Sequence, residues 1–232
     1  MNRQQALKII EKNRESYNKI AKDFDVSRKY EWPEFELLKP HIKEGDKILD
    51  IGCGNARLYK YLCGELNSQH YVGVDISANL IKIAKKTKCG ELDSPHKVEF
   101  GVVEKVWELP FEEGEFDSAA GIAFLHHIPS EELRLRVLRE IHRVLAPGGI
   151  LFLTNWNLWQ WNRIKKYKLR LRDFFFKHNE LDAGDFWIKF QGAERYYHHF
   201  TKGELTGLCK KAGFSVISCK KEMNMVIILR KQ

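Results

Sequence analysis

The chain has 232 residues, of which 44% are hydrophobic, enough for one α/β domain over 1–232 with a sizeable core. The formal net charge of +8 and a pI near 9.1 favour a polyanionic partner, although an ordinary basic cytosolic protein would also carry them. No stretch approaches the roughly 20 apolar residues that span a bilayer, and the charged N-terminus lacks a signal-peptide core. We therefore expect a cytoplasmic protein with no membrane partner.

The N-terminal residues 1–44 predict a helical cap. One helix is expected over 4–24 and a second from Pro33, which suits a first turn, to about residue 41. Strands are then predicted from residue 47, over 71–75, 98–100, 116–123 and 150–154, with a helix from about 130 to 145. This alternation predicts a parallel sheet with helices on both faces.

After residue 155 the pattern changes. No clear strand is predicted over 157–192, but six of the ten residues from 163 to 172 are Lys or Arg, and aromatic residues follow. The segment 157–200 is interpreted as a basic aromatic insertion or lid that contacts substrate, but a solvated cationic helix docked on the core would look the same. Thr201 and Glu204 then form a capping-box pattern, Gly213 can end that helix, and two strands close the chain.

The five cysteines are odd in number and include no Cys-x-x-Cys pair. Neither a disulfide framework nor a zinc knuckle is therefore predicted, and a reducing compartment is the simplest interpretation. Neither His-His pair has a set of ligands nearby, so no metal site is expected.

The turn after the first strand is the most informative feature. Gly52 and Gly54 leave the backbone open to a ligand. About twenty residues later, Asp75 ends a second strand, where a carboxylate can accept both hydroxyls of a ribose. An ordinary strand-to-helix connection could also contain two glycines, but no third glycine for a pyrophosphate and no phosphate-binding lysine motif follows. The pattern predicts a nucleoside-binding unit.

This arrangement resembles the S-adenosylmethionine (SAM) site of class I methyltransferases. Leu109-Pro110-Phe111 and Pro147-Gly148-Gly149 extend the resemblance, which implies a Rossmann-like α/β fold with a seven-stranded sheet whose last strand is antiparallel. Asp75 would bind the ribose, Ile76 would pack on adenine, and Tyr17 would close over the methionine carboxylate. Glu104 is the candidate adenine-binding acid, although Lys105 holds the usual place. The implied cofactor residues are Tyr17, Asp50, Gly52, Cys53, Gly54, Asp75, Ile76, Glu104 and Ala123.

A closer resemblance lies outside the glycine turn. The elements that carry it are Tyr17-Asn-Lys-Ile-Ala21, Phe24, Ser27-Arg28, Trp32-Pro33, His126-His127, Trp156, Arg195-Tyr196-Tyr197-His198 and Gly203-Glu204-Leu205. They are similar to the family that methylates the carboxymethyl group on tRNA wobble uridine, except that Ala56 replaces a glycine usual there. The resemblance implies the tRNA anticodon loop as substrate, with no role for DNA, and allows a small activator protein subunit.

A carboxylate acceptor is already anionic at neutral pH, so no general base is required and positioning is the main task. Arg28 and Arg195 are the candidates to hold that carboxylate or a neighbouring phosphate bidentately. His127 and His198 could hydrogen-bond the acceptor or the uracil edge. Salt bridges and structural histidines are the alternatives. Candidate substrate contacts are Trp32 and Trp156, which could stack a base or simply pack in the core, and Arg163, Lys165, Lys166, Lys168, Arg170 and Arg172.

Two other functions stay open. The same fold serves many acceptors, so a small-molecule O- or N-methyltransferase is one alternative. A non-catalytic RNA-binding module of this fold is another, although the intact glycine turn and Asp75 argue against it.

Overall fold

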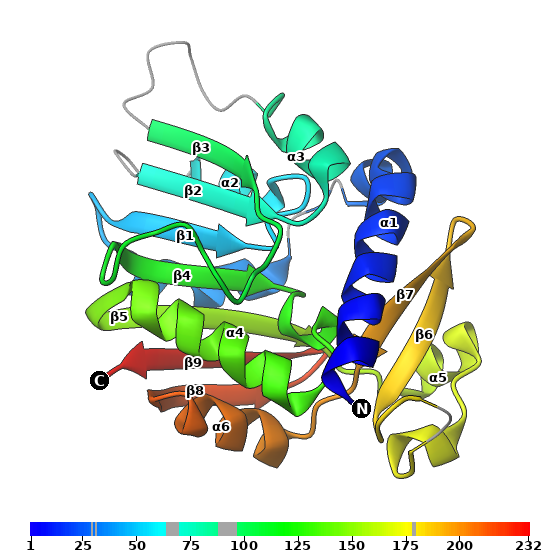
Figure 1. Ribbon diagram of the computed structural model, residues 1–232. Helices are drawn as coiled ribbons and strands as arrows, with labels where there is room; N and C mark the ends of the chain where they lie inside the picture. Colours follow the sequence, from blue (N-terminus) through cyan, green and yellow to red (C-terminus); the bar gives the residue numbers. More distant parts are fainter. Residues whose placement is uncertain (29, 31, 64–69, 88–96, 178–179) are drawn as a thin grey trace.

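A seven-stranded sheet forms the centre of the computed structural model, which describes residues 1–28, 30, 32–63, 70–87, 97–177 and 180–232 (Figure 1). The strand order is β3-β2-β1-β4-β5-β9-β8. Neighbours from β3 to β5 are parallel, whereas β9 is antiparallel to both β5 and β8. The expected sheet with an antiparallel last strand is therefore confirmed. The strands are β1 (Lys47–Ile51), β2 (His70–Asp75), β3 (Lys97–Val102), β4 (Phe116–Ile122), β5 (Leu145–Trp156), β8 (Phe214–Lys221) and β9 (Asn224–Lys231).

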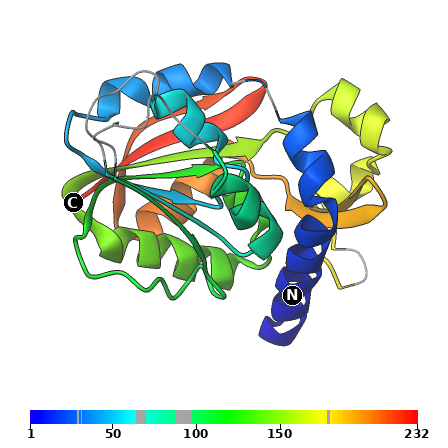
Figure 2. The same ribbon diagram turned by 90° about the horizontal axis from the view of Figure 1, so that it is seen from above.

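Helices cover both faces of this sheet (Figure 2). α4 (Glu131–Val144) and α6 (Lys202–Lys211) pack on one face. On the other lie α2 (Arg57–Cys63), α3 (Ala78–Ala84) and two 3₁₀ turns, η1 (Pro33–Leu37) and η2 (Lys39–His41). The continuous helix predicted over 33–41 is wrong, because Pro40 interrupts it and has no N–H to donate. A third 3₁₀ turn, η3 (Leu125–His127), follows β4.

Local signals account for α4 and α6. In α4, Leu133, Val137 and Ile141 recur every four residues and are buried on the sheet. The capping box predicted for α6 is present: Glu204 N–H donates to Thr201 Oγ1 at 3.1 Å, and the Glu204 side chain accepts from the Thr201 N–H. These two helices cover one face of the sheet and so hold β4 and β5, whose carboxyl ends lie near the site, in place.

A second, two-stranded sheet lies beside the main one (Figure 1). Its strands are β6 (Asp185–Phe190) and β7 (Ala193–His198), so the prediction of no strand over 157–192 is wrong. Gln191 and Gly192 have positive φ, as a two-residue hairpin turn requires. α5 (Trp161–Tyr167) and η4 (Leu171–Phe174) pack beside this hairpin through Leu169, Phe174 and Phe186.

The long first helix, α1 (Arg3–Ser27), joins the hairpin to the main sheet. The side chain of Asn13 is buried at this junction. Its Oδ1 accepts from the Tyr196 N–H at 2.8 Å, and its Nδ2 donates to the His127 carbonyl at 3.3 Å. One side chain thus fixes α1, η3 and β7 relative to one another.

One cysteine differs from the sequence prediction. Cys63 is disulfide-bonded, so the expectation of no disulfide is wrong at this residue; Cys53, Cys209 and Cys219 are free, and Cys89 lies outside the described residues. In the described part of the chain, no helix is long and apolar enough to cross a membrane, and no group of three or more His, Cys, Asp or Glu could hold a metal.

We expect Asn13→Ala to lower the free energy of unfolding by about 1–3 kcal/mol, because it leaves the buried Tyr196 N–H without an acceptor. Urea titration followed by circular dichroism measures this loss. Lys8→Ala, an exposed change on the same helix, is the control. Equal stability of Asn13→Ala and the control would show that this junction does not depend on Asn13.

Candidate active site

A cleft of about 870 Å³, including its open mouth, lies where the carboxyl ends of the strands meet α1 and β7. Ligands of open parallel sheets bind at this edge. Of the residues predicted from the sequence, those that line the cleft are Tyr17, Arg28, Trp32, Gly52, Gly54, Asp75, Ile76, Ala123, His127, Trp156 and Arg195. The lining residues without a predicted role include Asn13, Arg57, Val106 and Tyr197.

The glycine turn forms one wall. Gly52 and Gly54 have φ of +73° and +55°, which favour glycine. A Cβ on Gly52 would come within 2.7 Å of the Phe124 ring. The N–H groups of Gly52 and Cys53 donate to the Val74 carbonyl at 2.8 and 3.1 Å, so the turn is fixed to the end of β2. A ligand can therefore approach a rigid, open stretch of backbone.

Asp75 lies beside that turn. Its Oδ2 accepts from the Gly54 N–H at 3.0 Å and its Oδ1 accepts from the Ser77 N–H at 2.8 Å. Burial raises the pKa of this carboxyl to about 6, so it is largely ionised at neutral pH. A carboxylate has about four acceptor positions, and the Ile76 N–H is a third backbone donor to Asp75, which leaves one position for a ligand hydroxyl. With apolar Ile76, Leu80 and Val106 on the adjoining wall, the site fits a ribose bearing a flat base.

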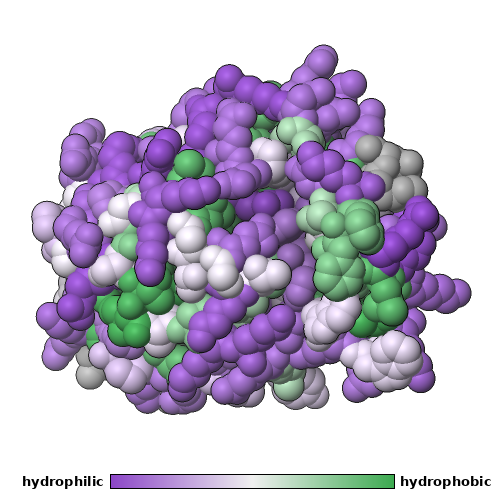
Figure 3. All heavy atoms as spheres, turned by 90° about the horizontal axis from the view of Figure 1, so that it is seen from below, coloured by the Kyte–Doolittle hydropathy of each residue, from purple (hydrophilic) through white to green (hydrophobic). Residues whose placement is uncertain are grey.

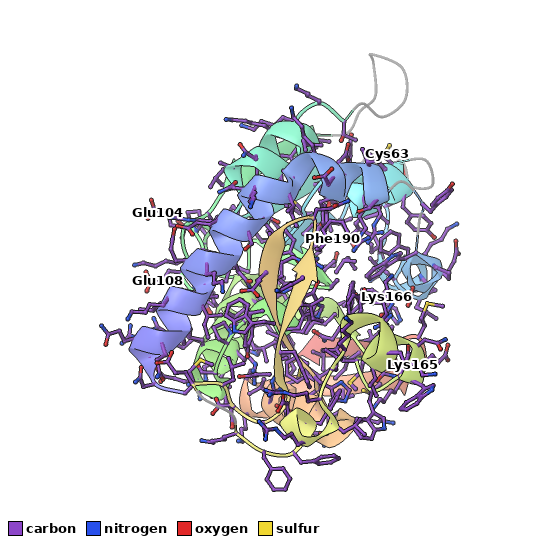
Figure 4. All side chains as sticks on the ribbon, turned by 90° about the vertical axis from the view of Figure 1, so that its right-hand side faces the viewer. Cys63, Glu104, Glu108, Lys165, Lys166 and Phe190 are labelled. Atoms are coloured by element: carbon purple, nitrogen blue, oxygen red, sulfur yellow. The ribbon has the colours of Figure 1, made fainter. Side chains whose placement is uncertain are left out.

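Three predicted cofactor residues lie outside the wall of the cleft. Asp50 is 1% exposed, its Oδ2 accepts from the Tyr71 hydroxyl, and burial raises its pKa to about 7. Cys53 is buried behind the turn. Glu104 is exposed at the outer edge of the molecule (Figure 4). None of these three side chains lines the cleft, so their positions do not match direct contact with the cofactor. Asp50 instead joins β1 to β2 through its hydrogen bond with Tyr71.

Arg195 forms the opposite wall and is 2% exposed. Its guanidinium carbon lies 4.9 Å from the ring centroid of Phe190, 5.2 Å from that of Tyr197 and 5.7 Å from that of Tyr17; Phe190 is seen on the hairpin in Figure 4. Its Nε has no hydrogen-bond partner among the described residues, and no carboxylate forms a salt bridge with it there. A buried cation in this setting calls for an anionic ligand.

His127 is held in one protonation state. Its Nδ1 lies 2.8 Å from the Tyr196 carbonyl, an acceptor, so we assign the proton to Nδ1. Its Nε2 must then accept from the Tyr17 hydroxyl at 2.8 Å. Burial and Arg195 lower the pKa of His127 to about 3. The Tyr17 oxygen consequently presents only lone pairs to the cleft, and the Arg195 guanidinium lies beside this side chain.

Tyr17 lines the cleft, and this geometry restricts how it could act on a methionine carboxylate. Because its proton is engaged by His127, the hydroxyl cannot donate to a methionine carboxylate. It can accept from a cation, and Arg195 lies beside it. His127 likewise positions groups, and its low pKa makes it a poor base near neutral pH.

Two more guanidinium groups lie near the mouth. Arg57 lies 4.3 Å over the Trp32 ring, and burial together with the charge of Arg28 lowers its pKa to about 10. Arg28 lies 5.2 Å from the Phe24 ring. Arg57 was not predicted from the sequence, although its place at the start of α2, directly after the glycine turn, was a usable signal.

His198 is not among the residues that line the cleft, so the structure does not bring it together with Arg28, His127 and Arg195. Its Nδ1 lies 2.7 Å from Asp185 Oδ1 and its Nε2 lies 2.7 Å from Glu204 Oε1. Side chains alternate along β7, so Arg195 and Tyr197 face the cleft whereas Tyr196 and His198 face this buried polar network with Arg134. His198 fastens the hairpin to α6.

The predicted basic contacts also lie outside the cleft. Arg163 donates to the Asn157 carbonyl at 3.2 Å and to Asn224 Oδ1 at 3.0 Å. Arg170 and Arg172 pair with Asp173. Lys165, Lys166 and Lys168 are exposed on and after α5. Arg163 is thus a structural residue, whereas the lysines are accessible to a partner.

We expect the His127 imidazole to show no titration between pH 5 and 8, because its pKa is near 3. Long-range ¹H–¹⁵N NMR correlation spectra should report a neutral ring protonated at Nδ1, with His127→Gln used to assign the signal. A midpoint near pH 6.5, or a proton on Nε2, would contradict the geometry described for Tyr17.

Comparison with known protein families gives one domain match: residues 48–149 match the model described as "Methyltransferase domain". The tRNA (carboxymethyluridine(34)-5-O)-methyltransferase of Schizosaccharomyces pombe is 30% identical over 216 residues, which cover 87% of each chain. The Arabidopsis thaliana protein of the same name is 36% identical over 140 residues. That match covers 60% of this chain and 31% of the Arabidopsis protein, so the chain spans about a third of this longer relative.

Solved structures are similar over nearly the whole chain. A SAM-dependent methyltransferase from Methanosarcina mazei is 29% identical with a TM-score of 0.71, over 87% of this chain and 98% of that one. A Haloferax volcanii methyltransferase, solved in complex with the Trm112 methyltransferase activator, has a TM-score of 0.68 at 14% identity, over 94% of this chain and 96% of that chain. The second likeness shows the fold alone.

Proposed function

Because the chain belongs to the SAM-dependent methyltransferase family that includes the fission-yeast wobble-uridine enzyme, we propose that it methylates the carboxylate of a carboxymethyl-modified wobble uridine in tRNA. The acceptor nucleoside would enter the cleft between Arg195 and the glycine turn. The observation that carries the proposal is the buried Arg195 guanidinium, which lines the cleft with its Nε unpartnered among the described residues.

The aromatic surroundings of Arg195 fit a nucleoside carrying an acid. Trp156 and Tyr197 both line the cleft, with ring centroids 5.0 Å apart, and such rings can stack an unpaired base. Arg195 would take the carboxylate of that base, because a guanidinium matches a carboxylate bidentately. Its burial strengthens this electrostatic contact.

The cofactor would occupy the other half of the cleft. SAM supplies a methyl group on a positively charged sulfur. Asp75 would accept from the ribose hydroxyls, Ile76, Leu80 and Val106 would pack on the adenine, and Gly52 and Gly54 would leave room for the methionine portion.

The site is suited to an acceptor that needs no deprotonation. His127, with a pKa near 3, is largely unprotonated but very weakly basic at neutral pH, and its Nε2 is occupied by Tyr17. A carboxylate is already ionised. The small-molecule alternative with an amine or hydroxyl acceptor would require a base that this wall of the cleft does not supply.

The partners of the reaction are part of the proposal. The substrate would be the anticodon loop of tRNA. An activator subunit of the Trm112 kind is a further candidate partner, because a structural neighbour was solved with one. Assays should therefore be run with and without such a subunit.

Cofactor binding should depend on the charge of Asp75. As the pH falls through about 6, the carboxyl takes up a proton, ribose hydroxyls lose their acceptor, and SAM affinity should fall. Calorimetric titration with SAM from pH 7.5 to 5 measures this fall. The Asp75→Asn variant should bind SAM at least about tenfold more weakly at pH 7.5, and its affinity should lose most of the pH dependence. Identical profiles for the two proteins would remove Asp75 from the cofactor site.

The acceptor role of Arg195 is tested by single-turnover methyl transfer to tRNA that carries carboxymethyluridine. Arg195→Ala should slow the reaction by about 10²-fold, because it removes a charge-assisted hydrogen bond to the acceptor, while SAM affinity is kept. Arg195→Lys should restore little of the rate because a point charge is not bidentate.

Arg139→Ala, on the exposed side of α4, is the matched control and should behave as wild type. The rate of the wild type should not rise between pH 6 and 8. Failure to methylate this tRNA, with or without activator, combined with transfer to an amine or hydroxyl acceptor, would overturn the proposed function.

A further inference from the structure

We propose that an exposed aromatic surface beside the cleft binds single-stranded RNA by stacking on unpaired bases. This aromatic platform consists of Trp159, Trp161, Phe175 and Phe176. Trp161, Phe175 and Phe176 are 63%, 63% and 69% exposed, which is unusual for side chains of this size. The inference rests on the proposed function and identifies where nucleotides flanking the target would lie.

The platform is an ordered surface. The Trp159 ring packs edge-on against Phe174 at 4.7 Å and against Phe175 at 5.6 Å between ring centroids. Phe174 in turn packs on Phe186 of β6 at 4.5 Å. In Figure 3, apolar side chains gather on the right-hand part of the molecule, where Figure 1 places α5 and the hairpin. Trp159 and, through it, Phe175 are thus supported from beneath by a small core.

Positive charge surrounds these rings. Lys165 lies 5.1 Å over the Trp161 ring and Lys166 lies 5.5 Å over that of Tyr167; both lysines are seen on α5 in Figure 4. Lys168 is also exposed, and none of the three forms a salt bridge among the described residues. Sites that bind single-stranded nucleic acid combine aromatic rings, on which bases stack, with cations that contact the phosphates.

The platform is continuous with the cleft. Trp156 lines the cleft and stacks on Tyr167 of α5, with ring centroids 6.0 Å apart. Arg163 of α5 covers the same Trp156 ring at 5.1 Å. A strand whose target base stacks near Trp156 would therefore pass along α5 and reach Trp161 and the phenylalanines within a few nucleotides.

Unpaired RNA is the occupant that these observations favour. An anticodon loop offers bases next to the target, and their flat faces match the rings irrespective of sequence. An anionic membrane surface would also attract exposed aromatic and basic side chains. It would not account for the continuity of the rings with the cleft.

The test compares binding of fluorescent oligouridylate, oligoadenylate and a fully paired RNA duplex to the full chain. Trp161→Ala and Phe175→Ala should each weaken single-strand binding about tenfold with an unchanged salt slope, and leave duplex binding as it is. Trp161→Phe should keep most of the affinity. Lys165→Gln with Lys168→Gln should reduce the magnitude of the logarithmic salt slope by about 0.7 for each phosphate that the protein no longer neutralises.

Val102→Ala and Ile217→Ala remove exposed apolar side chains on β3 and β8 and should have no effect. Single-strand affinity that is unchanged in the aromatic variants would overturn the inference, as would equal weakening by the two controls. Tryptophan-dependent binding to phosphatidylglycerol vesicles without a change in RNA affinity would assign the platform to membranes instead.

Methyl transfer separates this inference from the proposed function. If both hold, the aromatic variants raise the KM for tRNA at constant kcat. Single-strand binding through the platform without methylation of carboxymethyluridine would contradict the function alone. Methylation with a KM that the aromatic variants leave unchanged would contradict the platform alone.

Discussion

The site depends on one buried charge with which no carboxylate of the described residues forms a salt bridge. The Arg195 guanidinium lies among Tyr17, Phe190 and Tyr197, and removing such a group from water is costly unless an anion or a set of acceptors compensates. Part of the compensation comes from the Tyr17 oxygen, whose proton is directed away toward His127. The remainder is left for a ligand. Under the proposed function, this buried cation would be preorganised for the anionic acceptor before that acceptor arrives.

The nucleoside half of the site and the sheet could be predicted from the sequence because their signals are local. The glycines of the turn and the carboxylate of Asp75 stand at fixed places relative to two strands, and parallel strands bring those places together. The capping box of α6 is equally local. Pro40, by contrast, argues against one continuous helix over 33–41, because a proline beyond the first turn of a helix removes a backbone hydrogen bond.

The acceptor half was harder to predict because one strand was missed. Two runs that contain aromatic residues, 185–190 and 193–198, flank the two residues Gln191-Gly192. A glycine in a two-residue connection is a hairpin signal, which the basic and aromatic composition of the segment obscured. Once β7 is a strand, Arg195 and His198 must face opposite ways. The two faces of the sequence motif that contains both therefore differ: one lines the cleft, while the other fixes the hairpin through Asp185 and Glu204.

The direction in which the Tyr17 hydroxyl donates its proton could not be predicted from the sequence. It follows from the backbone carbonyl of Tyr196, which takes the proton of His127 Nδ1 and so makes Nε2 an acceptor. That carbonyl is held in place by β7, and β7 is held by Asn13 of α1. A hydrogen-bonded chain thus runs from Asn13 of the first helix through Tyr196 and His127 to the Tyr17 hydroxyl, which lies on the side chain next to Arg195. The N-terminal helix consequently covers the site and also helps to set the donor and acceptor roles of the groups within it.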